Sequence, residues 1–129
     1  IAMDTDNPVI QLCMAGSQAE FQGRHADAGR LYAQAWAAAG DNFEACIAAH
    51  YVARFQPDAQ ATLHWNQIAL ARAEAVNDDR VEPFFPSLYL NLGRSYEVLG
   101  QATLARHYYD LAAALGFPHQ EDPSAPDLD

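Results

Sequence analysis

YLNLGRSYEVLGQATLARHYYDLA, residues 89–112, is the stretch that decides the fold. Five of its residues occur earlier in the chain at one constant offset of 77 positions. Gly93, Gly100, Ala105, Tyr109 and Ala112 repeat Gly16, Gly23, Ala28, Tyr32 and Ala35. A recurrence of this kind predicts stacked helical hairpins, a class of protein that more often offers a surface to partners than a catalytic pocket.

The composition predicts an all-α fold in one domain. The chain has 129 residues, which is enough for one continuous core but not for two independent ones. Half of the residues are hydrophobic, 26 are alanine, and strong strand formers seldom cluster. Summed propensity therefore favours helix almost throughout.

The charge of the chain argues against several partners. Seventeen acidic residues stand against seven arginines, lysine does not occur, and the formal net charge is -10. Affinity for nucleic acid depends on cations that neutralise phosphates, and anionic membranes attract basic segments in the same way. We therefore expect no nucleic acid and no membrane among the partners.

The cysteines and the apolar runs indicate a cytoplasmic protein. Cys13 and Cys46 lie in apolar helical stretches without the spacing of a metal site or a disulfide scaffold, so we predict two buried thiols. The apolar runs are far shorter than the roughly 20 residues that cross a bilayer, and a signal-peptide pattern is missing. We interpret Ile1 and Ala2 as residues added ahead of a natural start at Met3.

Capping and turn residues divide the chain into helices. Asn7 before Pro8 predicts an N-cap, and Asp58 follows the turn residue Pro57. Two acidic pairs, Asp41 with Glu44 and Asp79 with Glu82, have the spacing of a capping box. Glycines and turn residues then end the segments, which gives expected helices over about 8–22, 24–39, 41–55, 58–76, 80–100 and 101–115.

These helices pair into hairpins at about 8–39, 41–76 and 80–115, inside a domain of residues 7–117. We expect residues 1–6 to be disordered and residues 118–129 to form a flexible, acidic tail that contains proline. In the third hairpin, Gly93 and Ala105 should let the paired helices approach closely, while Tyr96 and Tyr109 should fill the space between hairpins.

The third hairpin resembles the tetratricopeptide repeat. The order Leu-Gly, Tyr, turn Gly, Ala, aromatic, Ala that marks this family is met by residues 92–112. The first hairpin keeps the small residues and the aromatic, but has Leu12 and Ala19 where the family often has Trp and Tyr. The middle hairpin is degenerate. Over residues 8–117 the resemblance implies a right-handed superhelical stack of three antiparallel hairpins with a long middle repeat.

The resemblance also implies a non-catalytic interaction module or scaffold that binds a peptide or protein segment in a concave groove. The groove would be lined by the first helix of each hairpin, with Ile10, Met14, Ser17, Phe21, Ile47, Tyr51, Arg54, Asn91, Arg94 and Glu97 on its surface. Arg54 and Arg94 on one face would suit a carboxylate or carbonyl of the ligand. The alternative is that both arginines are solvated or paired within the chain.

More specific functions lack their residues. Family members that clamp the C-terminal carboxylate of chaperones use Lys, Asn and Arg, and of the matching positions only Asn91 has a similar side chain. The five histidines form no i, i+4 pair, so neither a metal nor another cofactor is expected. Asn7-Pro8-Val9-Ile10 lacks the aromatic of the base-modifying methyltransferase motif, so we disfavour methyl transfer and predict that the protein is not an enzyme.

Self-association is the alternative to peptide binding. Stacks of this family commonly end in a solvating helix, and here the last helix is followed only by the expected tail. One stripe of that helix would stay partly uncovered in a monomer and could serve as a dimer face: Leu104, Tyr108, Leu111 and Leu115. The same side chains could instead complete the core of their own hairpin, and the sequence leaves both readings open.

Overall fold

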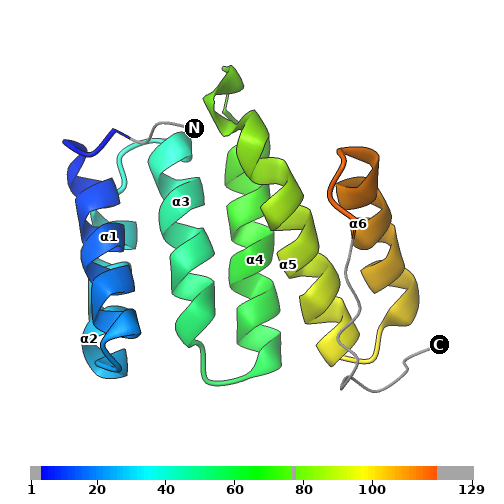
Figure 1. Ribbon diagram of the computed structural model, residues 1–129, viewed down its shortest axis with the longest axis horizontal. Coiled ribbons are helices and arrows are strands. Elements are labelled where there is room, and N and C mark those ends of the chain that lie inside the picture. The colour runs from blue at the N-terminus through cyan, green and yellow to red at the C-terminus, as the bar shows by residue number, and fades with distance from the viewer. Residues whose placement is uncertain (1–3, 77, 119–129) are drawn as a thin grey trace.

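The computed structural model describes residues 4–76 and 78–118, and within them the fold is all-helical, as predicted. The described residues form six α-helices. Their bounds are α1 Pro8–Phe21, α2 His25–Ala38, α3 Asn42–Val52, α4 Ala59–Glu74, α5 Phe85–Val98 and α6 Ala102–Ala114. In Figure 1, α1 and α2 overlap at one end of the longest axis, and α3, α4, α5 and α6 follow in chain order toward the other end. Two 3₁₀ helices, η1 Ala53–Phe55 and η2 Asp79–Phe84, complete the described part.

The predicted helix starts at Asn7 and Asp58 are confirmed. The Asn7 side chain accepts hydrogen bonds from the backbone N–H groups of Val9 and Ile10, and the Asp58 side chain accepts one from Ala61. The turn glycines end helices as expected, since Gly23 and Gly100 have φ of 78° and 76°. This left-handed conformation is one that glycine adopts without strain.

The Glu44 side chain has other hydrogen-bond partners than a capping box predicts. The Asp41 side chain does cap α3 by accepting from the Glu44 N–H at 2.8 Å. The Glu44 carboxylate, however, accepts from the Gly40 N–H at 2.8 Å and from Asn7 Nδ2 at 2.8 Å. One carboxylate therefore links the starts of α1 and α3 through Asn7 and Glu44, two residues 37 positions apart.

Two predicted helices differ from the structure. The third one ends at Val52 and continues as η1, and the fifth one begins as η2 before α5 starts at Phe85. The predicted cap pair Asp79 and Glu82 is wrong, because Asp78 caps η2 by accepting from the Arg80 N–H at 3.0 Å. Prolines explain the irregular start: Pro83 lies inside η2, and Pro86 occupies the first turn of α5.

Consecutive helices pack as hairpins, α1 with α2, α3 with α4, and α5 with α6, and the hairpins meet along α2–α3 and α4–α5. Inside the first and third hairpins, a tyrosine ring lies directly against a glycine. A Cβ on Gly16 would lie 2.3 Å from Cε1 of Tyr32, and a Cβ on Gly93 would lie 2.5 Å from Cε1 of Tyr109. Tyr109 thus fills the space within its hairpin, which corrects the prediction that it lies between hairpins.

The core between hairpins combines aromatic, aliphatic and small side chains. Trp36 of α2 meets Trp65 of α4 edge-on, with ring centroids 5.0 Å apart. Tyr96 of α5 packs with Leu63 of α4 in one cluster and accepts a hydrogen bond from Gln67, so its predicted place between hairpins is confirmed. Both cysteines are buried, as predicted, and burial raises the pKa of each thiol to about 12.

Some predictions fall outside the described residues. These are the structure of residues 1–3 and of 119–129, and thus most of the predicted tail. The right-handed superhelical course implied by the family resemblance stays a prediction.

The contact between glycine and tyrosine gives the first testable prediction. Gly93→Ala and Gly16→Ala should each destabilise the fold by about 1–3 kcal/mol, because the added methyl overlaps a tyrosine ring that is held in place. The matched control is Gly29→Ala in α2, whose new Cβ would meet only Phe55 Cβ at 3.8 Å. The control should be neutral or stabilising by up to about 1 kcal/mol through helix propensity. Urea denaturation measures all three, and equal effects at Gly16 and Gly29 would contradict the steric explanation.

Candidate functional site

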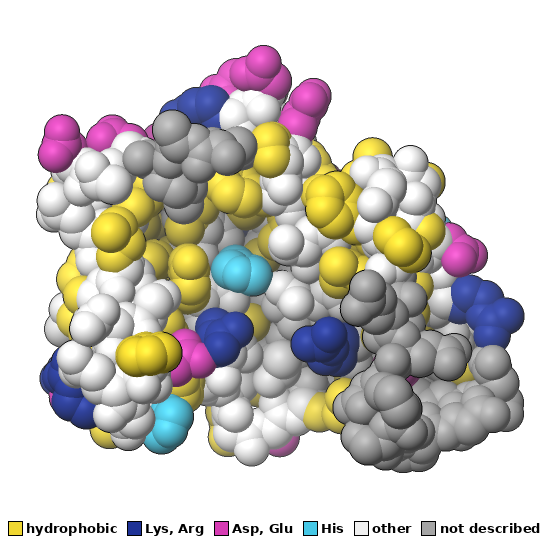
Figure 2. Space-filling model, viewed as in Figure 1, with side chains coloured by type: hydrophobic (Ala, Val, Ile, Leu, Met, Phe, Trp, Pro, Cys, Tyr) yellow, Lys and Arg dark blue, Asp and Glu magenta, His cyan; other side chains and the backbone are white. Residues whose placement is uncertain are grey.

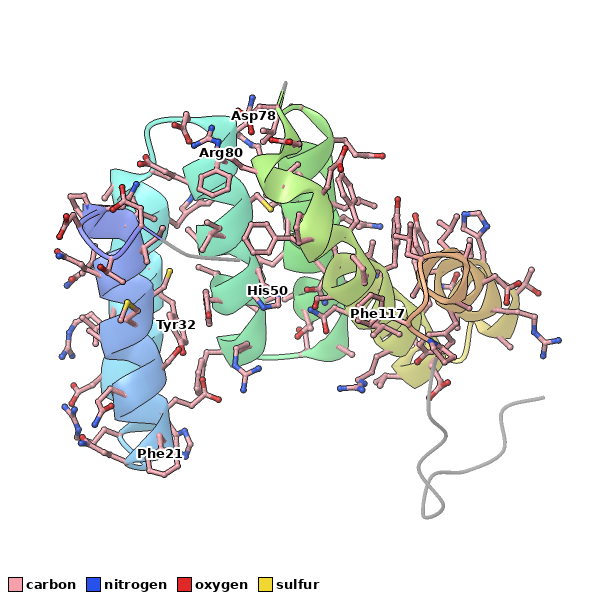
Figure 3. The ribbon with its side chains drawn as sticks, turned by 45° about the horizontal axis from the view of Figure 1, so that its top comes forward. Phe21, Tyr32, His50, Asp78, Arg80 and Phe117 are labelled. Carbon is pink, nitrogen blue, oxygen red and sulfur yellow. The ribbon has the colours of Figure 1, made fainter. Side chains whose placement is uncertain are left out.

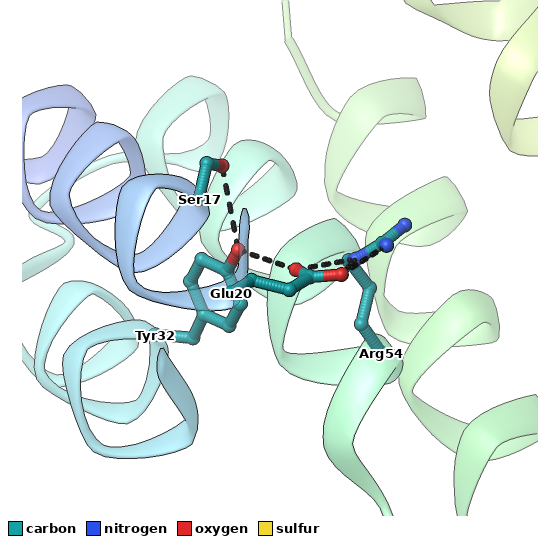
Figure 4. A network of polar contacts seen from close by, with 4 residues as sticks. All are labelled: Ser17, Glu20, Tyr32 and Arg54. Atoms are coloured by element: carbon teal, nitrogen blue, oxygen red, sulfur yellow. Dashed lines mark hydrogen bonds and ion pairs between the residues drawn. The ribbon is translucent and has the colours of Figure 1, made fainter. Parts of the chain in front are cut away.

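A polar network joins the first hairpin to the second (Figure 4). Tyr32 donates from its hydroxyl to Glu20 Oε1 at 2.9 Å and lies 3.3 Å from the Ser17 hydroxyl. Arg54 of η1 forms a bidentate ion pair with the Glu20 carboxylate. The Arg54 guanidinium lowers the pKa of Glu20, and burial raises the pKa of Tyr32 to about 12. Because the pair is partly exposed, it contributes at most about 1 kcal/mol.

The third hairpin repeats part of this network. Glu97 lies 77 positions after Glu20, and it is close enough to Tyr109 for its carboxylate to act on the tyrosine hydroxyl. Burial, and then Glu97, raise the pKa of Tyr109 to about 12. The pair of Tyr32 with Glu20 therefore recurs as Tyr109 with Glu97. Arg54, the ion-pair partner of Glu20, belongs to the junction of the first two hairpins.

A pocket of about 300 Å³ opens between α3, η1, α4 and α5. Its polar lining includes His50, Arg54, Asn91 and Arg94, and small residues and Val98 complete it. Asn91 Nδ2 lies 3.2 Å from His50 Nδ1, so the amide donates to the ring nitrogen and joins α5 to α3. Figure 2 shows a histidine and two basic side chains near the middle of this face, and Figure 3 shows His50 between α3 and α5.

The floor of the pocket holds a buried pair of polar side chains. Asn66 of α4 donates from Nδ2 to the Ser95 hydroxyl of α5 at 2.9 Å, and both residues are buried. Each group supplies the partner that the other needs away from water. The Thr62 hydroxyl at the wall donates to the backbone oxygen of Asp58 at 3.1 Å. The hydroxyls of Ser95 and Thr62 and the imidazole of His50 thus each bond to a different partner, and none of them bonds to another of the three.

The pocket unites three residues that the sequence analysis placed in a groove: Arg54, Asn91 and Arg94. Ser17 and Tyr51 lie at the neighbouring junction instead, where Tyr51 stacks on Tyr32 at a centroid distance of 5.1 Å. Met14 and Phe21 are exposed, Phe21 by 91% at the end of α1 (Figure 3).

Two of the predicted groove residues are core residues. Ile10 is 2% exposed and Ile47 is 5% exposed, and both belong to one cluster between α1, α2 and α3. Their placement on a ligand-facing surface is therefore corrected. The cause is the rotation of α1 and α3, which turn these isoleucines toward each other to bury apolar area.

The two pocket arginines differ in their partners. Arg54 is committed to Glu20, so the alternative of an arginine paired within the chain holds for this residue. Arg94 is exposed, and no carboxylate in residues 4–76 or 78–118 forms an ion pair with it. His50 is kept neutral over a wider pH range than usual, because burial and then Arg54 lower its pKa. The pocket is therefore positive through Arg94 in a chain of net charge -10.

A second pocket of about 370 Å³ lies where the α2–α3 connection meets the end of α4. Arg72 lines it, but this guanidinium lies 5.6 Å over the Trp36 ring and donates to Asn42 Oδ1 at 3.1 Å. Because its cation already has these contacts, we regard this pocket as a structural junction.

The four residues proposed as a dimer face differ in how far the structure buries them. Tyr108 stacks on Tyr96 with centroids 5.7 Å apart and so belongs to the core of its hairpin. Leu104 is 40% exposed, Leu115 is 51% exposed, and Leu111 is half-buried.

Comparisons with known proteins leave the family open. No protein-family model matches the chain, and neither the curated proteins nor the solved structures contain a match. Within the described residues, no helix has the length and apolar character of a membrane span. No group of three His, Cys, Asp or Glu side chains there could hold a metal ion.

The buried histidine gives a prediction for the dependence of stability on pH. The pKa of His50 is lower when the protein is folded than the ordinary value of about 6.5. Between these two values the unfolded chain binds a proton that the folded chain does not, so stability should fall as the pH drops below about 6.5, by at most about 1.4 kcal/mol per pH unit.

Urea denaturation between pH 7 and pH 5 measures this slope. His50→Gln should reduce it, whereas the control His64→Gln, at an exposed position of α4, should retain the contribution of His50. An unchanged slope in His50→Gln would show that His50 is not the responsible group.

Proposed function

We propose that this protein is a non-catalytic interaction module that binds an acidic segment of another protein across the face formed by α1, α3 and α5. The ligand would place a carboxylate in the pocket between α3, α4 and α5. The observation that carries the proposal is Arg94, an exposed cation at a preformed polar pocket of a strongly acidic chain.

The chemistry of the pocket supports a carboxylate as the bound group. Arg94 can donate two parallel hydrogen bonds to a carboxylate, an arrangement that is stronger and more directional than one between neutral groups. The Asn91 amide and the His50 ring lie beside it and can complete the hydrogen bonding of the second oxygen. The Glu20–Arg54 pair at the pocket wall is an internal example of the same recognition.

The surroundings support a peptide segment over a small molecule. A volume of about 300 Å³ is at the lower end of small-molecule sites. Exposed apolar side chains outside the pocket could contact a longer ligand as well. Val98 at its edge is 68% exposed, and on α1 Met14 and Phe21 are 52% and 91% exposed. Val98 at the edge of the charged pocket, together with the exposed apolar side chains of α1, suits a segment with an acidic residue and apolar neighbours.

The proposal that the module is not an enzyme rests on how the pocket groups are bonded. Nucleophilic catalysis needs a hydroxyl or thiol within hydrogen-bond reach of a base. Here Ser95 is paired with Asn66, Thr62 with a backbone carbonyl oxygen, and His50 with Asn91. Both thiols are buried away from the pocket lining, with pKa values raised to about 12. The resemblance to tetratricopeptide repeats points to the same class of function.

A displayed library of random dodecapeptides tests the proposal. Selection on the wild-type protein should enrich peptides with Asp or Glu next to apolar residues. Arg94→Gln should weaken binding of an enriched peptide at least about tenfold, because a charge-assisted hydrogen bond is worth about 1.5–3 kcal/mol. The same loss should follow from changing the peptide's acidic residue to its amide.

Arg30→Gln is the matched control, since it changes the net charge equally but lies on α2, paired with Asp27. Its affinity should stay within about twofold of the wild type, a difference of less than half a kcal/mol. Peptides without acidic residues, or equal losses for Arg94→Gln and Arg30→Gln, would overturn the proposed function.

Glu20 offers a test in the opposite direction. Glu20→Gln removes the carboxylate that holds Arg54 and frees this guanidinium at the pocket wall. Binding of the same acidic peptide, measured by calorimetry, should become several-fold tighter. The distant control Glu82→Gln on η2 removes the same charge and should have a smaller effect. Equally tighter binding in both variants would mean that the change in net charge, and not the release of Arg54, causes the effect.

A further inference from the structure

One side of α6 carries a stripe of apolar side chains that the described part of the protein covers only in part. Leu104, Tyr108, Leu111 and Leu115 follow one another at intervals of four, three and four residues, which is the spacing of a two-helix seam. Leu104 and Leu115 at its ends are 40% and 51% exposed. The main helical neighbour of α6 in the described chain is α5, and Figure 1 shows α6 at one end of the array.

The internal repeat shows that the leucines of this stripe are not needed to build a hairpin. At an offset of 77, the residues that match Leu104, Leu111 and Leu115 are Asp27, Gln34 and Ala38 of α2. Asp27 is engaged with Arg24 and Arg30 at the surface, and Gln34 and Ala38 are exposed.

The first hairpin nevertheless keeps the glycine–tyrosine contact of the third, without any leucine at these positions. The three leucines are therefore additional to the hairpin core, which decides against the reading that they merely complete it. Tyr108 is different, since Leu31 stands at its matching position and both side chains pack in the core.

We propose that the α6 stripe is a dimer interface in which α6 of a second copy packs antiparallel across a two-fold axis. The spacing four, three, four reads the same in both directions, so a two-fold axis between residues 109 and 110 sets Leu104 against the partner's Leu115 and Tyr108 against the partner's Leu111. An interface made of one surface on both copies is the commonest form of homodimer.

The charges of α6 fit a second copy of the same helix. In a chain of net charge -10, residues 102–114 hold one cation, Arg106, and one anion, Asp110. The helix is therefore locally neutral when its histidine is neutral, and two copies of it can approach without the repulsion that other surfaces would meet. Repulsion between the remaining charges persists at longer range, and salt should weaken it.

The size of the stripe sets the strength that we expect. Four side chains per copy bury much less than the roughly 800 Å² per partner of a stable interface. The dimer should therefore dissociate on dilution, and its population should rise with salt. This assembly is independent of the proposed peptide site, which lies between α3, α4 and α5.

Sedimentation equilibrium of the full chain over a wide concentration range, at low and at moderate salt, is the first test. We expect the mass to rise from one chain toward two, at lower concentration when salt is added. Leu111→Asp should keep the mass at one chain, while the control Val98→Asp, which places the same charge on an exposed apolar residue of α5, should still dimerise. A wild-type mass of one chain at every concentration would overturn the proposal.

Disulfide trapping tests the geometry without relying on Leu111→Asp folding. A mixture of Leu104→Cys and Leu115→Cys chains should cross-link between the two variants under a mild oxidant. Leu104→Cys alone should cross-link poorly, because antiparallel packing separates the two copies of residue 104 by about 16 Å along the helix axis. Native Cys13 and Cys46 are 2% and 1% exposed and should not compete. Efficient cross-linking of Leu104→Cys with itself would exclude the antiparallel pairing.

Discussion

The close approach of a tyrosine ring to a glycine is the constraint on which the rest of the structure depends. Gly16 with Tyr32 and Gly93 with Tyr109 leave no room for a Cβ, so each pair fixes how near the helices of its hairpin lie. In the first hairpin, Tyr32 also contacts the second hairpin. Tyr51 stacks on the Tyr32 ring, and the ring centroid of Phe55 lies 5.8 Å from that of Tyr32. A contact inside one hairpin thereby positions η1, and with it Arg54 at the wall of the pocket.

The proposed site combines a buried polar floor, made of Asn66 and Ser95, with an exposed rim that includes Arg94 and Val98. Asn66 and Ser95 satisfy each other in the interior, and Asn91 holds the His50 ring, so α3, α4 and α5 are linked by polar bonds as well as by apolar packing. Such pairs are specific in geometry, because an unmet buried polar group costs about 1–3 kcal/mol. A pocket built on three helices keeps its shape before a ligand arrives, which lowers the entropy lost on binding.

The sequence was sufficient for the features that depend on local chemistry. Asn7, Asp58, Gly23 and Gly100 mark helix ends through their own capping or backbone preferences, and all four were predicted correctly. The cap of η2 was not, since Asp78 and Asp79 are both able to cap and only the geometry of the turn selects Asp78.

Features that depend on contacts far apart in the chain could be predicted only in part. The burial of Ile47 follows from the rotation of α3 against α1, and the pairing of Arg54 with Glu20 spans 34 positions. Helical periodicity does not resolve either contact. Glu97 is an instructive exception, because the offset of 77 that links the glycines also links this residue to Glu20 and could have indicated its place beside Tyr109.

The Glu44 carboxylate has a consequence for how the protein opens. It receives one hydrogen bond from Asn7, which caps α1, and one from the Gly40 N–H just before α3. Fraying of either helix start removes a partner from the same carboxylate, so the two ends share one local opening equilibrium. The N-terminal hairpin is thereby bound to the middle one at both extremities, by Glu44 at one end and by Glu20 with Arg54 at the other, and these two hairpins should exchange their amide protons as a single cooperative unit.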